Sequence, residues 1–204
     1  MPYRRNAFVP GNIYHVYNRG VDGMHVFANP GNYVYLLRKV KRLLTEQHIS
    51  VLAYCLMPNH YHFVLRQDGD VPISGFVQRL FQTYTQAFNK QQGRRGPLFE
   101  GRFRHVHVDR DEYALHLCRY VHLNPVAAGM VSHPAEWLYS NYPEWVGARS
   151  GTLVDLAFVR QFFSTADAYV EFVLGQIAPS RSWGLRPYLL DDDDLPESYE
   201  LSGR

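Results

Sequence analysis

The chain has 204 residues, of which 46% are hydrophobic and 20% charged, a balance typical of a globular protein and not of a fibrous or disordered one. Its longest apolar run, Val51 to Met57, is far shorter than the roughly 20 residues that cross a bilayer. The N-terminal segment lacks the apolar core of a secretory signal, and the two cysteines, Cys55 and Cys118, form no CxxC pair. We therefore expect a cytoplasmic protein without membrane spans.

The formal net charge of +2 conceals a marked asymmetry along the chain. Residues 1–124 hold 16 Lys and Arg against 8 Asp and Glu, whereas residues 125–204 hold 5 against 11. Clustered basic side chains neutralise phosphates and release their counterions, so a polyanionic partner is one interpretation of the first part. A solvated basic surface is the alternative, and charge alone does not decide between them.

Hydrophobic periodicity predicts six elements up to residue 108, with alternation indicating strands and three-four spacing indicating helices. In chain order they are a strand at 13–18, a helix after residues 29–31 with Val34, Leu37, Val40 and Leu44 on its apolar face, strands at 49–56 and 61–66, a helix at 73–90 and a strand at 103–108. This order is the split βαβ plan of an α+β, ferredoxin-like antiparallel sheet with helices on one face.

A third helix is predicted from a capping box at Asp109 and Glu112 to about Pro125. Its apolar stripe comprises Ala114, Leu117, Cys118 and Val121, and the side chains at successive i+4 positions beside the stripe are His116, Tyr120 and Asn124. The residue pattern of 132–177 predicts an aromatic and helical C-terminal extension. Residues 178–204 predict a disordered acidic tail around Asp191 to Asp194.

Two histidine pairs at alternate strand positions are candidates for a divalent metal. Alternation puts His60 and His62 on one face, about 7 Å apart in Cα position, and it does the same for His105 and His107. Spacing does not choose between the pairs, although the arginines around the second pair suit phosphate better than a cation. For both pairs, ordinary strand histidines without a ligand are the alternative.

The third predicted helix carries the other candidate groups. The hydroxyl of Tyr120 could attack a phosphate that a metal polarises, and the amide oxygen of Asn124, one turn later, could complete the coordination. A packing role is the alternative for Tyr120, and Pro125 leaves the helical geometry of Asn124 open.

Four sequence motifs together resemble a known family. They are YHVYNRG at 14–20, MPNHYHFVL at 57–65, GPLFEGRF at 96–103 and RYVHLNPVAAGMV at 119–131. In this order they are similar to the bacterial single-tyrosine transposases of the IS200 type, and most of all to the domesticated REP-associated tyrosine transposases. The resemblance covers residues 8–145, and we expect a catalytic domain at 1–131, the extension at 132–177 and the tail at 178–204.

The resemblance implies a role for each candidate residue. His60, Tyr61 and His62 match the HUH motif of the family, which selects this pair over His105 and His107. The family nucleophile falls on Tyr120 and the third metal ligand on Asn124, with Mg²⁺ or Mn²⁺ as the cofactor. The implied activity is cleavage and transfer of single-stranded DNA through a 5′-phosphotyrosine intermediate.

The implied partner is single-stranded DNA folded into a hairpin, such as a repetitive extragenic palindrome, in the bacterial nucleoid. Unpaired bases could stack on Tyr3 or Phe103. We expect phosphate contacts at Arg4, Arg5, Arg94, Arg95, Arg102 and Arg104. Both a monomer and a homodimer are consistent with the family.

Three other hypotheses follow from the same residues. A hairpin-binding protein that no longer cuts is one, and a metal hydrolase of small phosphoesters is another. In the third, the acidic tail occupies the basic surface in place of DNA, so that truncation near residue 178 strengthens DNA binding.

Overall fold

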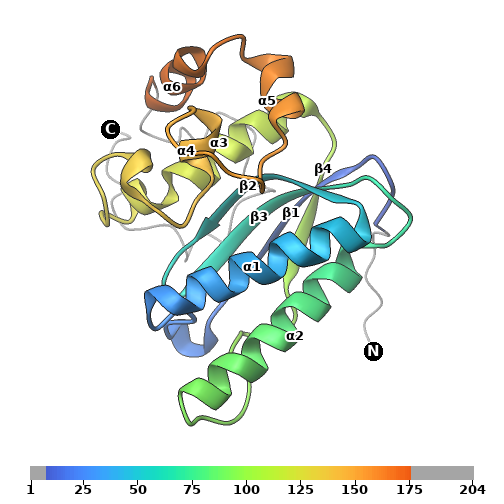
Figure 1. The fold of residues 1–204 in the computed structure, drawn as a ribbon, viewed down its shortest axis with the longest axis vertical. Coiled ribbons are helices and arrows are strands. Elements are labelled where there is room, and N and C mark those ends of the chain that lie inside the picture. Colours follow the sequence, from blue (N-terminus) through green and yellow to red (C-terminus); the bar gives the residue numbers. More distant parts are fainter. Residues whose placement is uncertain (1–7, 176–204) are drawn as a thin grey trace, which may run out of the picture.

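The structure, a computed structural model, describes residues 8–175. The predicted acidic tail, the predicted phosphate contacts Arg4 and Arg5 and the stacking residue Tyr3 lie outside this range. Within these residues, four strands form one antiparallel sheet in the order β2-β3-β1-β4 (Figure 1). The strands are β1 (Ile13–Arg19), β2 (Ile49–Leu56), β3 (His60–Gln67) and β4 (Arg104–Val108). This confirms the predicted ferredoxin-like α+β fold.

The helices flank the sheet on both sides. They are α1 (Pro30–Gln47), α2 (Ile73–Gln91), α3 (Asp111–Ala127), α4 (Tyr142–Trp145), α5 (Leu156–Phe162) and α6 (Ala166–Leu174), with short 3₁₀ turns at Val21–Gly23 and Pro134–Glu136. Figure 1 shows α1 and α2 side by side across one face, while α3 and the C-terminal helices gather on the other side. None of the helices described is both long and apolar enough to cross a membrane.

The face under α1 and α2 is an aromatic core built from alternate residues of the strands. Tyr61 and Phe63 of β3 point into it, and the Tyr61 ring stacks on Phe81 of α2 with 3.9 Å between centroids. Buried aromatic bodies of this size contribute much of the apolar area that stabilises a small sheet. The buried residues of α2 keep the three-four spacing that predicts a helix at 73–90; they are Ile73, Phe76, Val77, Leu80, Phe81, Tyr84 and Phe88.

The apolar face predicted for α1 needs correction. The residues buried on this helix include Tyr33, Leu36, Val40 and Leu43, whereas Val34 is 42% exposed. The prediction left out Tyr33, which stacks on Phe27 at 4.2 Å between centroids. Because the tyrosine is the larger apolar body, its burial turns the helix so that Val34 faces outward.

The opposite face is covered by α3 in the predicted register. Leu117, Cys118 and Val121 are fully buried against strand residues that include Val64. The predicted capping box does not form, because the helix begins after Arg110 and has no side-chain cap. The helix also continues to Ala127, beyond Pro125. Proline is tolerated there because it lies in the last turn, where only one backbone hydrogen bond is lost.

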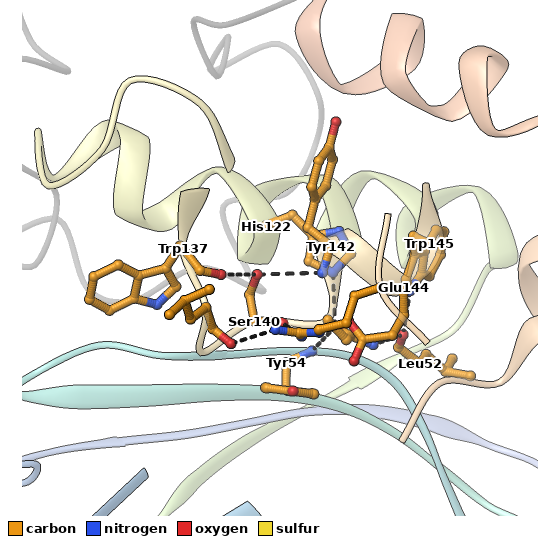
Figure 2. Close-up of polar contacts among 11 residues, drawn as sticks. Leu52, Tyr54, His122, Trp137, Ser140, Tyr142, Glu144 and Trp145 are labelled. Carbon is orange, nitrogen blue, oxygen red and sulfur yellow. Dashed lines mark hydrogen bonds and ion pairs between the residues drawn. The ribbon is translucent and has the colours of Figure 1, made fainter. Parts of the chain in front are cut away.

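The C-terminal extension closes the open edge of β2. The backbone N–H of Leu56 donates to Tyr139 O at 2.9 Å, and that of Asn141 donates to Tyr54 O at 3.3 Å. The side chain of Asn141 accepts from Tyr54 N–H at 2.7 Å and donates to Leu52 O at 3.0 Å. Figure 2 labels Tyr54 and Leu52 at this edge and His122 of α3 above them. An edge strand with paired backbone groups is a poor template for pairing with another sheet.

A buried histidine connects this edge to α3. The Nε2 atom of His122 lies 3.0 Å from Asn141 Oδ1, and its Nδ1 lies 2.6 Å from the hydroxyl of Tyr169 in α6. Both ring nitrogens therefore have partners if Nε2–H donates to the amide oxygen and Nδ1 accepts from the tyrosine. Burial lowers the pKa of His122 to about 4, so the ring is neutral at physiological pH.

Substitution of Asn141 should destabilise the whole chain. In Asn141→Ala the Tyr54 N–H and the His122 ring lose their partner inside the core, and we expect the free energy of unfolding to fall by about 3 kcal/mol. Urea denaturation measures this change. Asn89→Ala, which removes an exposed hydrogen bond to Gly96 O and another from Arg94, is the control and should cost less than about 1 kcal/mol. Equal losses in the two variants would contradict a special role for Asn141.

His122 should make stability depend on pH. The unfolded chain binds a proton on this ring as the pH falls through the ordinary pKa of 6.5, whereas the folded chain does so only near 4. Stability is therefore highest above pH 6.5, falls between 6.5 and 4, and by this route loses at most about 3 kcal/mol. Chemical denaturation from pH 7 to pH 4 should show a smaller fall for His122→Gln than for the wild type. The same substitution at exposed His25 should leave the fall unchanged.

Candidate active site

Strand β3 and helix α3 bring the four predicted residues together. The rings of His60 and His62 meet edge to face with 5.0 Å between centroids, and the Tyr120 ring lies 5.6 Å from that of His62. Asn124 Oδ1 lies 3.1 Å from His60 Nε2. Two segments about sixty residues apart in sequence thus form one cluster, as the alternation of the strand and the i+4 spacing of the helix predict.

The register of the sheet explains which neighbours surround the cluster. His62 lies opposite Tyr17 of β1, and Tyr17 in turn lies opposite Arg104 of β4. Side chains directly opposite each other share a face of the sheet, so Arg104 is on the same face as His62, two strands away. Arg19 lies opposite His60 in the same way.

The second histidine pair lies on the other face. His105 is opposite Val16 and His107 is opposite Tyr14, and both partners belong to the core under α1 and α2. The ring of His107 contacts that of Tyr14 at 5.3 Å between centroids. Because α3 lies on the opposite side of the sheet, this pair is remote from Tyr120.

His62 is neutral and fully buried. Burial and the neighbouring His60 and His15 place its pKa well below the ordinary value. Its Nδ1 lies 3.0 Å from His15 Nε2, while its Nε2 is buried with no hydrogen-bond partner among residues 8–175. A buried polar atom without a partner is costly, and a neutral imidazole nitrogen in this position suits a metal ion.

His60 and Asn124 meet in a way that also fits a cation. The Nδ1 atom of His60 lies 2.7 Å from Asn59 Oδ1, and its Nε2 lies 3.1 Å from Asn124 Oδ1. A neutral ring carries one hydrogen and can donate to only one of these two oxygens. With the hydrogen on Nδ1, at the shorter contact, the Nε2 lone pair faces a lone pair of Asn124 Oδ1. Two lone pairs repel each other unless a cation lies between them, and adjacent ligands of an octahedral metal at about 2.1 Å are about 3 Å apart.

The residues present therefore fit a divalent metal with two imidazole ligands and one amide ligand. Within residues 8–175, no three or more His, Cys, Asp or Glu side chains form a metal-binding group. The third protein ligand would accordingly be an amide oxygen, that of Asn124. Mg²⁺ and Mn²⁺ both accept oxygen ligands, and imidazole suits Mn²⁺ better.

His116, which precedes Tyr120 by one turn, belongs to a different contact. Arg119 Nη2 donates to its Nδ1 at 2.9 Å, and its ring lies 5.4 Å from that of Phe172 in α6. Burial and Arg119 lower the pKa of His116. This side chain fastens α3 to α6 and does not join the histidines of β3.

A groove of about 750 Å³ runs between α2 and the segment that leads into β4. One wall presents the amides of Gln78, Gln82 and Gln86, which are spaced four residues apart along α2. The other wall includes Arg102 and Phe103, and none of the lining residues is acidic. Side-chain amides, an aromatic ring and a guanidinium are groups that bind bases and phosphates.

The predicted basic contacts occupy different settings. Arg95, Arg102 and Arg104 are exposed. Arg94 donates from its guanidinium to Asn89 Oδ1 at 3.2 Å and to Pro97 O at 3.1 Å, and so holds the turn that follows α2.

Two residues of the site were not predicted from the sequence. Asn59 contacts Nδ1 of His60, and His15 contacts Nδ1 of His62. Asn59 is the residue directly before His60, so its proximity was available from the sequence. His15 belongs to the motif at 14–20, but its contact with His62 depends on the pairing of β1 with β3, which periodicity does not give.

Comparison with known families gives the class of protein to which this sheet and its covering helix belong. The model of the IS200-like transposase family matches residues 12–124, more than half of the chain. The chain belongs to the IS200-like transposase family.

Two solved structures are similar to the chain, and the first of them shares its fold. One, a REP-associated tyrosine transposase bound to a REP hairpin, is 18% identical with a TM-score of 0.58, over 76% of this chain and 94% of the other. A second, a protein of Deinococcus radiodurans R1 described as a transposase, is 19% identical with a TM-score of 0.41, over 59% and 95% of the two chains. No curated protein matches the chain.

Proposed function

We propose that the chain is a metal-dependent endonuclease and strand transferase that acts on single-stranded DNA at REP-like hairpins. The observation that supports it best is the position of α3, which places Tyr120 and Asn124 against the two histidines of the HUH motif. All four side chains come from one chain, so a complete site does not require a second copy.

In this proposal His60, His62 and Asn124 hold Mg²⁺ or Mn²⁺. When bound, such an ion would supply positive charge to neutralise the non-bridging oxygens of the scissile phosphate. The hydroxyl oxygen of Tyr120 forms a bond to phosphorus, and the bond from phosphorus to the 3′-oxygen breaks. The proton lost by the tyrosine hydroxyl balances the one gained by the departing 3′-oxygen. The products are a free 3′-hydroxyl and a 5′-phosphotyrosine. Attack by another 3′-hydroxyl reverses the step and joins the strands.

DNA binding is assigned to basic residues on both sides of the sheet, because the groove borders α2 whereas the histidine cluster lies under α3. Arg104 lies on the same face of the sheet as His62, two strands away. Arg102 lines the groove beside α2. The groove would take unpaired nucleotides, with Phe103 as a stacking surface and the α2 glutamines contacting base edges. Further phosphate contacts are proposed at Arg4, Arg5, Arg94 and Arg95. The solved relative bound to a REP hairpin supports a hairpin as the ligand.

Tyr120→Phe should abolish the covalent adduct. The protein is incubated with Mn²⁺ and a labelled strand carrying a palindromic hairpin with unpaired flanks from its host, and the products are separated on a denaturing gel. The wild type should give a protein–DNA adduct that disappears with chelator. Tyr113→Phe, at another tyrosine of α3, is the matched control and should retain the adduct.

Other outcomes of this assay favour the alternatives. A wild-type chain that shifts the hairpin on a native gel but gives no adduct would be a hairpin-binding protein. Metal-dependent turnover of a small phosphodiester without any adduct would indicate a phosphoester hydrolase. An adduct that survives in Tyr120→Phe would mean that another residue is the nucleophile.

Arg102→Ala should weaken DNA binding without changing the sequence preference. A phosphate contact contributes mainly through counterion release, so the slope of log affinity against log salt should fall by about 0.7 to 0.9. The slope is measured by fluorescence anisotropy at several salt concentrations, with a labelled DNA hairpin that carries unpaired flanks. Arg79→Ala, also an exposed arginine but paired with Glu46 on α1, should keep the wild-type slope. The same slope in wild type and Arg102→Ala would remove the groove from the proposed interface.

A further inference from the structure

His62 has a close neighbour that the proposed mechanism does not use. Its Nδ1 lies 3.0 Å from Nε2 of His15 on the adjacent strand β1, and both side chains are fully buried. The two rings are nearly parallel, at 17° with 5.2 Å between centroids. His15 lies opposite Val64, so it is the diagonal neighbour of His62 on the face that α3 covers.

One hydrogen atom lies between these two nitrogens, and its position decides what His62 presents to a metal. If Nδ1 of His62 carries the hydrogen and His15 accepts it, Nε2 of His62 has a free lone pair. If His15 donates instead, a neutral His62 carries its hydrogen on Nε2 and cannot bind a cation there. Only the first arrangement is compatible with His62 as a metal ligand.

We propose that His15 is a positioning residue that keeps His62 in its metal-binding tautomer by accepting the hydrogen from Nδ1. The inference rests on the proposed function, because it assigns His15 a role toward the proposed metal site. The unpartnered Nε2 of His62 is the atom that this arrangement makes available. Ligating histidines are usually fixed by such an acceptor on the other ring nitrogen.

The partner of His60 provides a parallel within the same site. Asn59 Oδ1 lies 2.7 Å from Nδ1 of His60, which leaves Nε2 of His60 beside Asn124. Both histidines of the HUH motif are thus held through Nδ1 by a neighbouring side chain. For His62, which is the buried one of the two, the acceptor is the imidazole of His15. His15 can accept through Nε2 only when its own hydrogen is on Nδ1.

The first test reads the tautomer directly in the wild-type chain. Long-range ¹H–¹⁵N spectra of ¹⁵N-labelled protein distinguish the two neutral forms, and comparison with His62→Gln assigns the His62 signals. We expect the Nδ1–H form in the metal-free chain and no change when Mg²⁺ is added. The Nε2–H form in the metal-free chain would overturn the proposal. This measurement needs no substitution at His15, so it does not depend on how well such a variant folds.

The second test measures Mn²⁺ affinity from the free-ion signal in electron paramagnetic resonance. His15→Leu removes the acceptor and should weaken Mn²⁺ binding about 10- to 100-fold. His15→Gln places an amide near the position of Nε2 and should restore much of that affinity. His107→Leu, at a strand histidine on the opposite face, should bind Mn²⁺ as the wild type does. Urea denaturation of each variant checks that the fold persists.

The outcomes separate this proposal from the proposed function. Unchanged Mn²⁺ affinity in His15→Leu would overturn the role of His15 even if the wild type forms the Tyr120 adduct. If the expected tautomer and the loss of affinity are found but no adduct forms, the cleavage proposal fails and the positioning role stands. A wild-type chain that binds no Mn²⁺ would overturn the metal site and the role of His15 together.

Discussion

The packing of α3 against the sheet is the constraint on which the site depends. The helix is fixed in rotation by Leu117, Cys118 and Val121, which are fully buried. A rotation of one residue, about 100°, would expose this stripe at a cost of several kcal/mol and would carry Tyr120 away from His62. The apolar stripe therefore does more than stabilise the fold, because it also sets the distance between the helix and the histidines of β3.

The extension contributes to the same constraint although it follows the segment that matches the family. Tyr142, Trp145 and Tyr169 belong to the core that includes the buried stripe of α3. His122 joins α3 to Asn141, and Asn141 joins the edge of β2. The edge strand, the helix and the extension are therefore joined by one buried network of hydrogen bonds that runs through Asn141 and His122.

The elements were predictable where one periodicity dominates, and the contacts between elements were not. Alternation placed His60 and His62 on one face of a strand, and i+4 spacing placed Tyr120 beside Asn124. The choice of this histidine pair needed either the family motifs or the position of α3 over one face of the sheet. The role of His15 depends on the register between β1 and β3, which brings together residues 47 positions apart. The apolar face of α1 was misjudged because aliphatic spacing alone ignores the burial of a tyrosine.

Under the proposed function, the three protein ligands of the metal carry no net charge, and this affects how metal and DNA would bind. Two neutral imidazoles and an amide carry no negative charge, so a divalent cation among them keeps its full charge until another ligand arrives. Burial keeps His62 neutral, and basic residues such as Arg104 lie on the same face. Under the proposed function, a DNA phosphate would supply the missing negative charge. Metal and DNA should therefore strengthen each other's binding, and by linkage the factor is the same in both directions.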